Sequence, residues 1–284
     1  MLCRPMGSAS RQYGHSGIDR HRSACGYGPA WWLLALLPTL ALADTEAPAN
    51  GAWQLMRGQL YGTRDIGESG DQLMTIEAPA STPDPTATPL VVRFGADLVG
   101  KVRQVRVVID NNPSPLAATL NLTAALPVDE IDLRVRIDRF TSVRAIAETA
   151  GGRLEMRSTW VNASGGCSAP PSAAEGGVLG QIRFRAADDN RALQFSIRHP
   201  NNSGFQVDPR TGDFIAPHFI SHIRLLAGGQ TVLDADTGIS LSENPTLRIA
   251  TRQPLSAPLT VEASDLPTQT QYRGTWQGTA TAAN

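Results

Sequence analysis

One cysteine carries the most distinctive chemistry of the chain. Cys167 lies in the segment 162–177, N-A-S-G-G-C-S-A-P-P-S-A-A-E-G-G, which consists mostly of small and turn-forming residues. Gly165 and Gly166 permit close backbone approach and a positive φ, and the Pro170-Pro171 pair stiffens the other side. Because these neighbours offer no apolar wall, we expect an exposed thiol on a flexible, solvated strap over 163–177, within reach of other proteins.

The expected chemistry of this thiol is that of a passive carrier. An exposed cysteine has a pKa of about 8.5, so only about 3% is thiolate at pH 7. Such a group suits loading by a partner enzyme better than unaided nucleophilic attack. The alternative is an inert free cysteine, a type that is usually buried.

The N-terminal 43 residues have the layout of a secretory signal. Arg4, Arg11, Arg20 and Arg22 precede the apolar run 31–43, which ends in Ala41-Leu42-Ala43. The run is shorter than the ~20 apolar residues that span a bilayer. Cleavage removes Cys3 and Cys25 and leaves Cys167 alone in an exported, periplasmic protein without a membrane span. An unpaired cysteine there indicates a reactive thiol or a disulfide-linked dimer.

Composition excludes two classes of partner. The formal net charge is -1 and 18% of the residues are charged, so no long-range field favours nucleic acid or an anionic membrane. The length after cleavage is enough for two small β domains or one large one.

Short strands separated by Gly, Pro and Asn turns fill the region before the strap. The segment 131–138 alternates strictly, with Ile131, Leu133, Val135 and Ile137 on one face and Asp132, Arg134, Arg136 and Asp138 on the other. One face therefore meets the core and the other meets water, as in an antiparallel sandwich over 44–162. The predicted strands are 90–94, 105–110, 118–123, 131–138 and 143–147.

The region after the strap, 178–284, has the same character. Ala227-Gly-Gly-Gln230 predicts a hairpin turn between two of its strands. The predicted strands are 181–185, 193–198, 219–226, 231–234, 247–250 and 259–263.

Other candidate sites are less favourable. His218 and His222 are four residues apart on a predicted strand, about 13 Å at 3.3 Å per residue, too far for joint metal ligation, so no metal site is predicted. A Cys167/His199 catalytic pair has nothing in the sequence to orient the histidine. Arg183 and Arg185 share a strand face and could contact an anionic adduct on Cys167, although a solvated face is the simpler interpretation.

Several segments resemble the two subunits of the bacterial sulfur-oxidation (Sox) carrier. Trp53–Gly62, Ile76–Pro79, the turn Asp110–Pro115, Val143–Ala147 and the Gly-Gly-Cys at 165–167 resemble the Y subunit. The segments H-P-N-N-S-G-F-Q-V-D-P-R-T-G-D-F-I-A-P-H-F-I at 199–220 and G-I-S-L-S-E-N-P at 238–245 resemble the Z subunit. The resemblance covers nearly the whole mature chain.

The resemblance implies an all-β fold with two Ig-like antiparallel β-sandwich domains, Y-like at 44–162 and Z-like at 178–284, joined by the cysteine-bearing strap. It implies that Cys167 holds sulfur intermediates covalently, that the protein is not an enzyme, and that it needs no other cofactor. The fused form resembles SoxYZ-like carriers associated with pyrroloquinoline-quinone dehydrogenases. Two departures limit the swing of the cysteine: Ser168-Ala169-Pro170 replaces two glycines, and the strap is internal.

The expected partners follow from this resemblance. Periplasmic sulfur-oxidation enzymes would load and unload Cys167. The alternative function is a non-catalytic accessory protein that docks onto a quinoprotein dehydrogenase or a cytochrome c.

Overall fold

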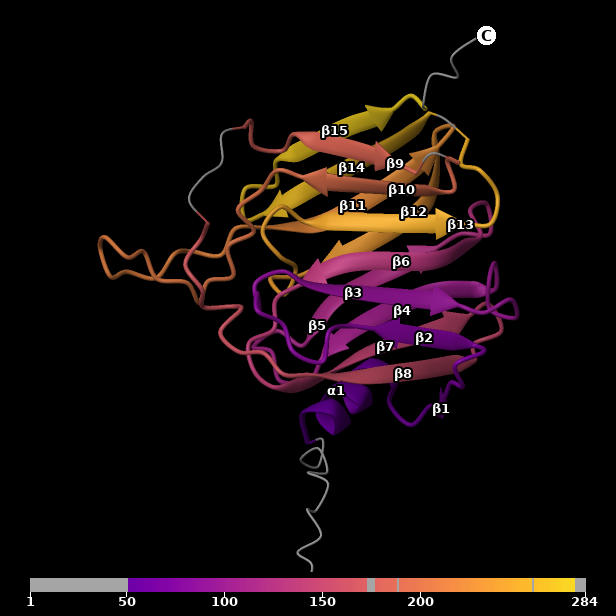
Figure 1. Ribbon diagram of the computed structural model, residues 1–284, viewed down its shortest axis with the longest axis horizontal. Helices are drawn as coiled ribbons and strands as arrows, with labels where there is room; N and C mark the ends of the chain where they lie inside the picture. The colour runs from indigo at the N-terminus through magenta and orange to yellow at the C-terminus, as the bar shows by residue number, and fades with distance from the viewer. Residues whose placement is uncertain (1–50, 173–176, 188, 257, 279–284) are drawn as a thin grey trace, which may run out of the picture. The chain divides into compact units, whose positions relative to one another are not determined.

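Two β-sheets packed face to face make up nearly all of the computed structural model, which describes residues 51–172, 177–187, 189–256 and 258–278 (Figure 1). The predicted signal at 1–43 lies outside the described residues. No helix of the described part has the length and apolar character needed to cross a membrane.

The elements before and after the strap alternate short strands with turns. The first half, residues 51–172, contains α1 (Gly51–Tyr61), β1 (Ile66–Glu68), β2 (Met74–Glu77), β3 (Thr88–Phe94), β4 (Val102–Ile109), β5 (Leu116–Leu122), β6 (Val128–Val135), β7 (Thr141–Thr149) and β8 (Leu154–Val161). The second half, residues 177–278, contains β9 (Ile182–Ala186), β10 (Ala192–Ile197), β11 (Phe219–Ala227), β12 (Gln230–Thr237), β13 (Thr246–Thr251), β14 (Leu259–Leu266) and β15 (Gln271–Trp276).

Both sheets contain strands from both halves. The nine-stranded sheet has the order β1-β8-β7-β4-β5-β12-β11-β14-β15, and the six-stranded sheet has the order β2-β3-β6-β13-β10-β9. The halves meet where β5 pairs with β12 and β6 pairs with β13, both antiparallel. We call these two pairings the seam. The Ig-like all-β sandwich that the sequence predicts is thus confirmed, and its halves continue edge to edge into each other.

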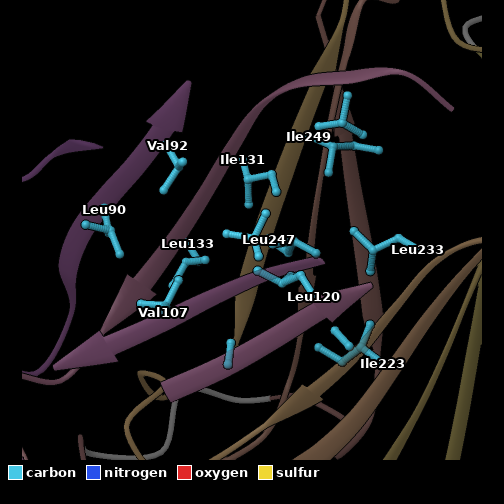
Figure 2. Packing of buried hydrophobic residues seen from close by; sticks show 14 of the residues in the cluster. Leu90, Val92, Val107, Leu120, Ile131, Leu133, Ile223, Leu233, Leu247 and Ile249 are labelled. Carbon is cyan, nitrogen blue, oxygen red and sulfur yellow. The ribbon is translucent and has the colours of Figure 1, made fainter. Parts of the chain in front are cut away.

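The core between the sheets is shared in the same way. Figure 2 shows side chains of the first half, such as Leu120 and Ile131, beside side chains of the second half, such as Leu233 and Leu247. Alternation produces this arrangement, because every second residue points inward along β3, along β6 from Ile131 onward and along β13. Burial of apolar side chains on both sides of the seam therefore stabilises the two halves together.

Helix α1 covers the outer face of the nine-stranded sheet near β7 and β8 (Figure 1). Its Trp53 and Tyr61 are buried against Val108 and Ile146. Their rings also lie under the guanidinium groups of two strand arginines, Arg144 over Trp53 at 4.8 Å and Arg106 over Tyr61 at 5.1 Å.

The expected hairpin at 227–230 is confirmed. Gly228 and Gly229 both have positive φ, at 57° and 83°, between β11 and β12. A two-residue turn with left-handed backbone at both positions matches the twist of the flanking strands, and glycine adopts it without steric cost.

The prediction for the polar face of 131–138 is wrong at Arg136. Arg134 is exposed as expected, but Arg136 is only 2% exposed. Strand β6 ends at Val135, and the next residues are covered by the second half: Arg136 N–H donates to Ser240 O at 2.7 Å. The alternating pattern predicts the exposure of residues within β6 correctly. It gives no information on which residues pack against the chain after β6 ends.

Leu120 tests the coupling of the halves, because it pairs with Ala235 across the seam and is 1% exposed. We expect Leu120→Ala to lower the free energy of unfolding by about 2–5 kcal/mol. Denaturant unfolding should show one transition, with the fluorescence of Trp53, Trp160 and Trp276 changing together with the circular dichroism. Leu55→Ala, at an exposed helix position, should shift stability by less than about 0.5 kcal/mol. Separate transitions for the two halves would contradict a shared core.

Candidate functional site

Cys167 is fully buried at the seam. Its relative exposure is 0%, and its own carbonyl accepts a 2.5 Å hydrogen bond from Ser203 Oγ of the second half. Two residues later, Ala169 O accepts a hydrogen bond from Gln206 Nε2 at 3.0 Å. Ser203 and Gln206 are themselves buried and joined to each other, since Ser203 N–H donates to Gln206 Oε1 at 2.9 Å. A turn of the second half thus holds the strap closed over the thiol.

The two glycines before Cys167 meet different steric requirements of the closed strap. Gly165 has a φ of 79°, and its N–H donates to Asp138 O at 2.8 Å. Gly166 N–H donates to Ile137 O at 2.9 Å, and a side chain at Gly166 would collide with the carbonyls of Pro85 and Ile137. The expected need for positive φ and close approach is confirmed. Whether these glycines also make the strap flexible stays a prediction.

A buried arginine lies beside the cysteine. Arg136 donates from Nη1 to Gly166 O at 3.2 Å, from Nη2 to Asn201 O at 3.3 Å and from Nε to Leu241 O at 3.2 Å. One guanidinium therefore joins the strap to two turns of the second half. Among the described residues, no carboxylate lies within ion-pair distance of Arg136; three carbonyl groups accept its hydrogen bonds, and the charges of Glu243 and Asp84 act on it only from farther away.

Burial decides the protonation state of the thiol. The pKa of Cys167 is raised from an ordinary 9.0 to about 12, mainly by removal from water and also by the charge of Asp138, against the lowering effect of Arg136. The same desolvation lowers the pKa of Arg136, while the proximity of Cys167 raises it. Since desolvation is the largest cause, the closed strap holds a neutral, protected thiol.

The expectations of a solvated thiol and a pKa near 8.5 are therefore wrong for the closed strap. The residues next to Cys167 in sequence are indeed too small to cover it. The cover comes from Arg136, Ser203 and Gln206, which are distant in sequence and polar, and which bind the strap through its carbonyl groups.

Arg183 and Arg185 lie on one exposed face of β9, as expected. Arg183 donates to Gln181 Oε1 at 3.4 Å, and Arg185 lines a surface hollow together with Arg248. Neither has a described hydrogen bond or ion pair to the residues around Cys167, so their contact with an anionic adduct stays a prediction. The arginine that adjoins the cysteine is Arg136, which sequence reasoning had assigned to a water-facing position.

The turn 110–115 is confirmed as a turn with structural contacts. Asp110 forms a buried two-point ion pair with Arg144, with oxygen to nitrogen distances of 2.8–3.0 Å. Burial raises the pKa of Asp110, and Arg144 opposes that rise. Asn112 donates to Arg136 O at 2.7 Å and so fixes the chain next to the buried guanidinium.

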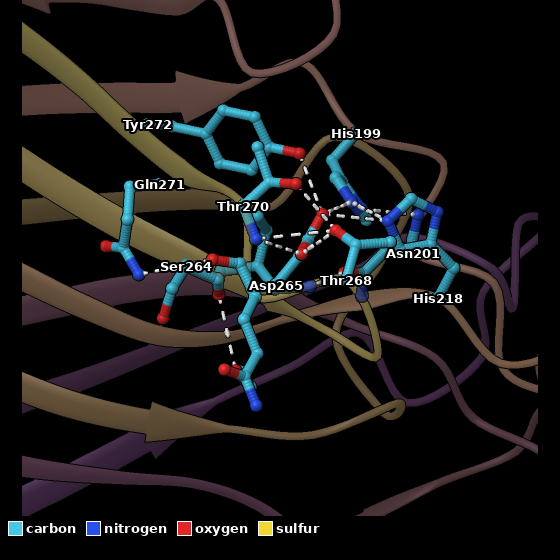
Figure 3. A network of polar contacts seen from close by, with 12 residues as sticks. His199, Asn201, His218, Ser264, Asp265, Thr268, Thr270, Gln271 and Tyr272 are labelled. Carbon is cyan, nitrogen blue, oxygen red and sulfur yellow. Dashed lines mark hydrogen bonds and ion pairs between the residues drawn. The ribbon is translucent and has the colours of Figure 1, made fainter.

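A second polar cluster is built around Asp265 near the end of β14 (Figure 3). Its Oδ2 accepts hydrogen bonds from Tyr272 Oη at 2.7 Å and lies 2.8 Å from His218 Nε2 and 3.4 Å from His199 Nε2. Its Oδ1 accepts bonds from Thr268 Oγ1 and from Thr270 N–H. Three different loops therefore converge on one carboxylate.

The pKa values of three groups in this cluster are strongly shifted. Burial by itself raises the pKa of Asp265, but the hydrogen bonds from Thr268, His218 and Tyr272 outweigh it and hold the pKa well below the ordinary range. Burial and nearby His218 lower the pKa of His199 to about 4, against the opposing effect of Asp265. Burial and Asp265 raise the pKa of Tyr272 to about 12. At neutral pH the carboxylate is ionised and His199 is neutral.

Neither pair considered in the sequence, His218 with His222 or Cys167 with His199, is formed in the structure. His218 precedes β11 and joins His199 and Asp265, whereas His222 lies in β11 and contacts Asp234 and Asp236 on β12. The Cys167/His199 pair is not formed, because His199 Nδ1 accepts the Asn201 N–H at 3.0 Å and Nε2 faces His218 and Asp265. Asp265 was not singled out, since a single aspartate in a strand gives no local signal.

Comparisons with known proteins match each half of the chain to a known family. The family model "Sulfur oxidation protein SoxY" matches residues 57–167, and "Sulphur oxidation protein SoxZ" matches residues 182–275. The search of curated proteins found no match. The solved sulfur carrier protein SoxY from Chlorobium limicola f thiosulfatophilum is 20% identical over 39% of this chain and 91% of its own, with a TM-score of 0.34. A biofilm associated protein, BSP domain, is 11% identical over 74% of this chain and 30% of its own, with a TM-score of 0.24.

The all-β fold and the two family matches in tandem define a sulfur-oxidation carrier of the SoxY–SoxZ type. The chain belongs to this family as a fused form, in which a SoxY domain is followed by a SoxZ domain.

Burial predicts low reactivity of Cys167. At pH 7–8 we expect iodoacetamide to alkylate the folded protein on the order of 100-fold more slowly than the urea-unfolded chain, because the reagent must wait for opening. The folded rate should keep rising above pH 9, where a free thiol levels off, because a thiol with a pKa near 12 is still mostly protonated there. Mass spectrometry measures both rates. Fast alkylation that levels off near pH 9 would show an exposed cysteine.

Proposed function

We propose that the protein is a periplasmic carrier that holds sulfur intermediates covalently on Cys167 and presents them to partner enzymes. The observation that carries this proposal is the position of Cys167: it is the last residue of the SoxY match and is enclosed by the SoxZ half at the seam. The SoxY and SoxZ families are sulfur-oxidation proteins, which supports a carrier that is not itself an enzyme.

The chemistry of loading requires a partner. If thiosulfate is the cargo, joining it to the thiol forms one sulfur–sulfur bond and releases one proton and two electrons, so an oxidising enzyme has to take those electrons. The closed thiol is neutral and buried, so it also has to become exposed and ionised before it reacts. Both requirements fit a passive carrier whose reactivity is set by its partners.

Opening the strap is therefore part of the proposed function. The closed state is held by Ser203 and Gln206 at the strap carbonyls and by Arg136 at Gly166. Hydrogen bonds of this kind each contribute about 0.5–1.5 kcal/mol net. A few such bonds can keep the thiol closed most of the time and still allow opening when a partner binds the open form.

A disulfide-linked dimer through Cys167 also needs the open strap, because the sulfur of the closed form is enclosed. The accessory role beside a quinoprotein dehydrogenase or cytochrome c stays a prediction from the sequence.

The strap bonds give a testable rate. We expect the double variant Ser203→Ala/Gln206→Ala to raise the alkylation rate of Cys167 by about 5- to 150-fold, corresponding to the loss of its two bonds to the strap at about 0.5–1.5 kcal/mol each. Ser168→Ala is the matched control, since Ser168 adjoins Cys167 but is exposed and bonds only within the strap. Thermal melting separates local opening from general destabilisation. An unchanged alkylation rate in the double variant would contradict the proposed closure.

The carrier function itself is tested by intact mass. Protein purified from the native periplasm without reductant should carry added mass of sulfur, sulfite or thiosulfate size, which dithiothreitol removes and which Cys167→Ser lacks. Growth without a reduced sulfur source should lower the modified fraction. An unmodified thiol in cells that oxidise sulfur compounds would argue against the carrier and favour the accessory role.

A further inference from the structure

The cluster around Asp265 has a geometry that hydrogen bonding alone does not require. His199 Nε2 and His218 Nε2 lie 3.2 Å apart, and Asp265 Oδ2 lies 3.4 Å from the first and 2.8 Å from the second. The two imidazole rings meet edge to face, with centroids 4.4 Å apart and planes at 77°. Figure 3 shows both rings directed at the same carboxylate oxygen.

These spacings are those of metal ligands. Ligand atoms bound at about 2.0–2.1 Å to a tetrahedral ion lie about 3.3 Å apart, and neighbouring ligands of an octahedral ion lie about 3 Å apart. The three edges of the triangle, 2.8, 3.2 and 3.4 Å, fall around these values. Two imidazoles and one carboxylate are a donor set typical of zinc and other divalent transition metals.

The surroundings also resemble a metal site. Tyr272 Oη donates to Asp265 Oδ2, and Thr268 Oγ1 and Thr270 N–H donate to Oδ1, so the carboxylate is held in a fixed orientation. Outer hydrogen bonds of this kind orient the ligands of metal centres. The side chains of His199 and Asp265 are fully buried, whereas that of His218 is 24% exposed, so an ion would reach the cluster from the side of His218.

Proton positions determine what an ion must displace. The Asn201 N–H donates to His199 Nδ1, so without an ion the proton of the neutral ring lies on Nε2, facing Asp265. His218 likewise donates from Nε2 to Asp265. An ion takes the place of these two protons, each of which moves to Nδ1 of its own ring. Binding therefore gives up the hydrogen bond from the Asn201 N–H to His199 Nδ1.

We propose that His199, His218 and Asp265 form a binding site for one divalent transition-metal ion of the zinc class. The ion joins the turn after β10, the segment before β11 and the end of β14. Solvent or a small ligand completes the coordination on the side of His218. This site goes beyond the proposed carrier function and does not involve Cys167.

Calorimetric titration of the full chain with Zn²⁺ tests the site, with Cys3, Cys25 and Cys167 all replaced by Ser as the background so that no thiol competes. We expect one equivalent to bind and to raise the melting temperature, because the ion binds the folded form. In the same background, Asp265→Asn keeps the shape but should weaken binding by at least about tenfold, and Tyr272→Phe should weaken it by about tenfold through loss of the outer hydrogen bond.

His222→Ala is the matched control, because His222 is four residues from His218 and has its own carboxylate neighbours. It should bind zinc as the background does. The proposal is overturned if no saturable binding occurs, if Asp265→Asn and Tyr272→Phe both bind as the background does, or if His222→Ala abolishes binding. Melting without zinc shows whether each variant is folded. Since every protein in this test lacks the thiol, the result is independent of the carrier function.

Discussion

The pairing of β5 with β12 and of β6 with β13 is the constraint on which the rest of the structure depends. It makes two sequence halves share both sheets and one apolar core. It also fixes what lies just beyond the paired strands: Arg136 follows β6, and the turn with Ser240 and Leu241 precedes β13. The thiol is enclosed because the part of the strap around it is hydrogen-bonded to Arg136 of the first half and to Ser203 and Gln206 of the second half.

Two opposing electrostatic effects meet at the enclosed thiol. Arg136 favours a negative charge on the sulfur, whereas the loss of water disfavours it more strongly, so the neutral form is retained. A buried guanidinium without a carboxylate partner is costly to maintain, and here three carbonyl groups offset part of that cost. The arrangement favours storage of the thiol over reaction. For a partner that binds only the open strap, the apparent affinity is the intrinsic affinity multiplied by the fraction of molecules that are open.

The sequence was sufficient for the fold class and most of the strands, because these depend on local alternation, turn residues and composition. It did not reveal β8, whose Glu155, Met156 and Arg157 interrupt the β-branched pattern. It also placed Arg136 in water and Cys167 in solvent. Both errors have one cause: burial there comes from contacts between residues distant in sequence, such as Ser203 with Cys167. The cluster at Asp265 was missed because its three members lie far apart in the sequence, with His199 and His218 in two loops and Asp265 in β14.

The strap is attached to the sheets at both ends, by β8 on one side and β9 on the other. An arm with one free end can enter a narrow tunnel as a single extended chain. In the proposed open state, a segment fixed at both ends would leave the surface as a loop. Cys167 would lie on this loop, with the chain leading away from it in both directions. An enzyme that takes this sulfur into its active site would therefore need an entrance wide enough for two antiparallel stretches of backbone. The width of the active-site entrance would then limit which enzymes could use this carrier.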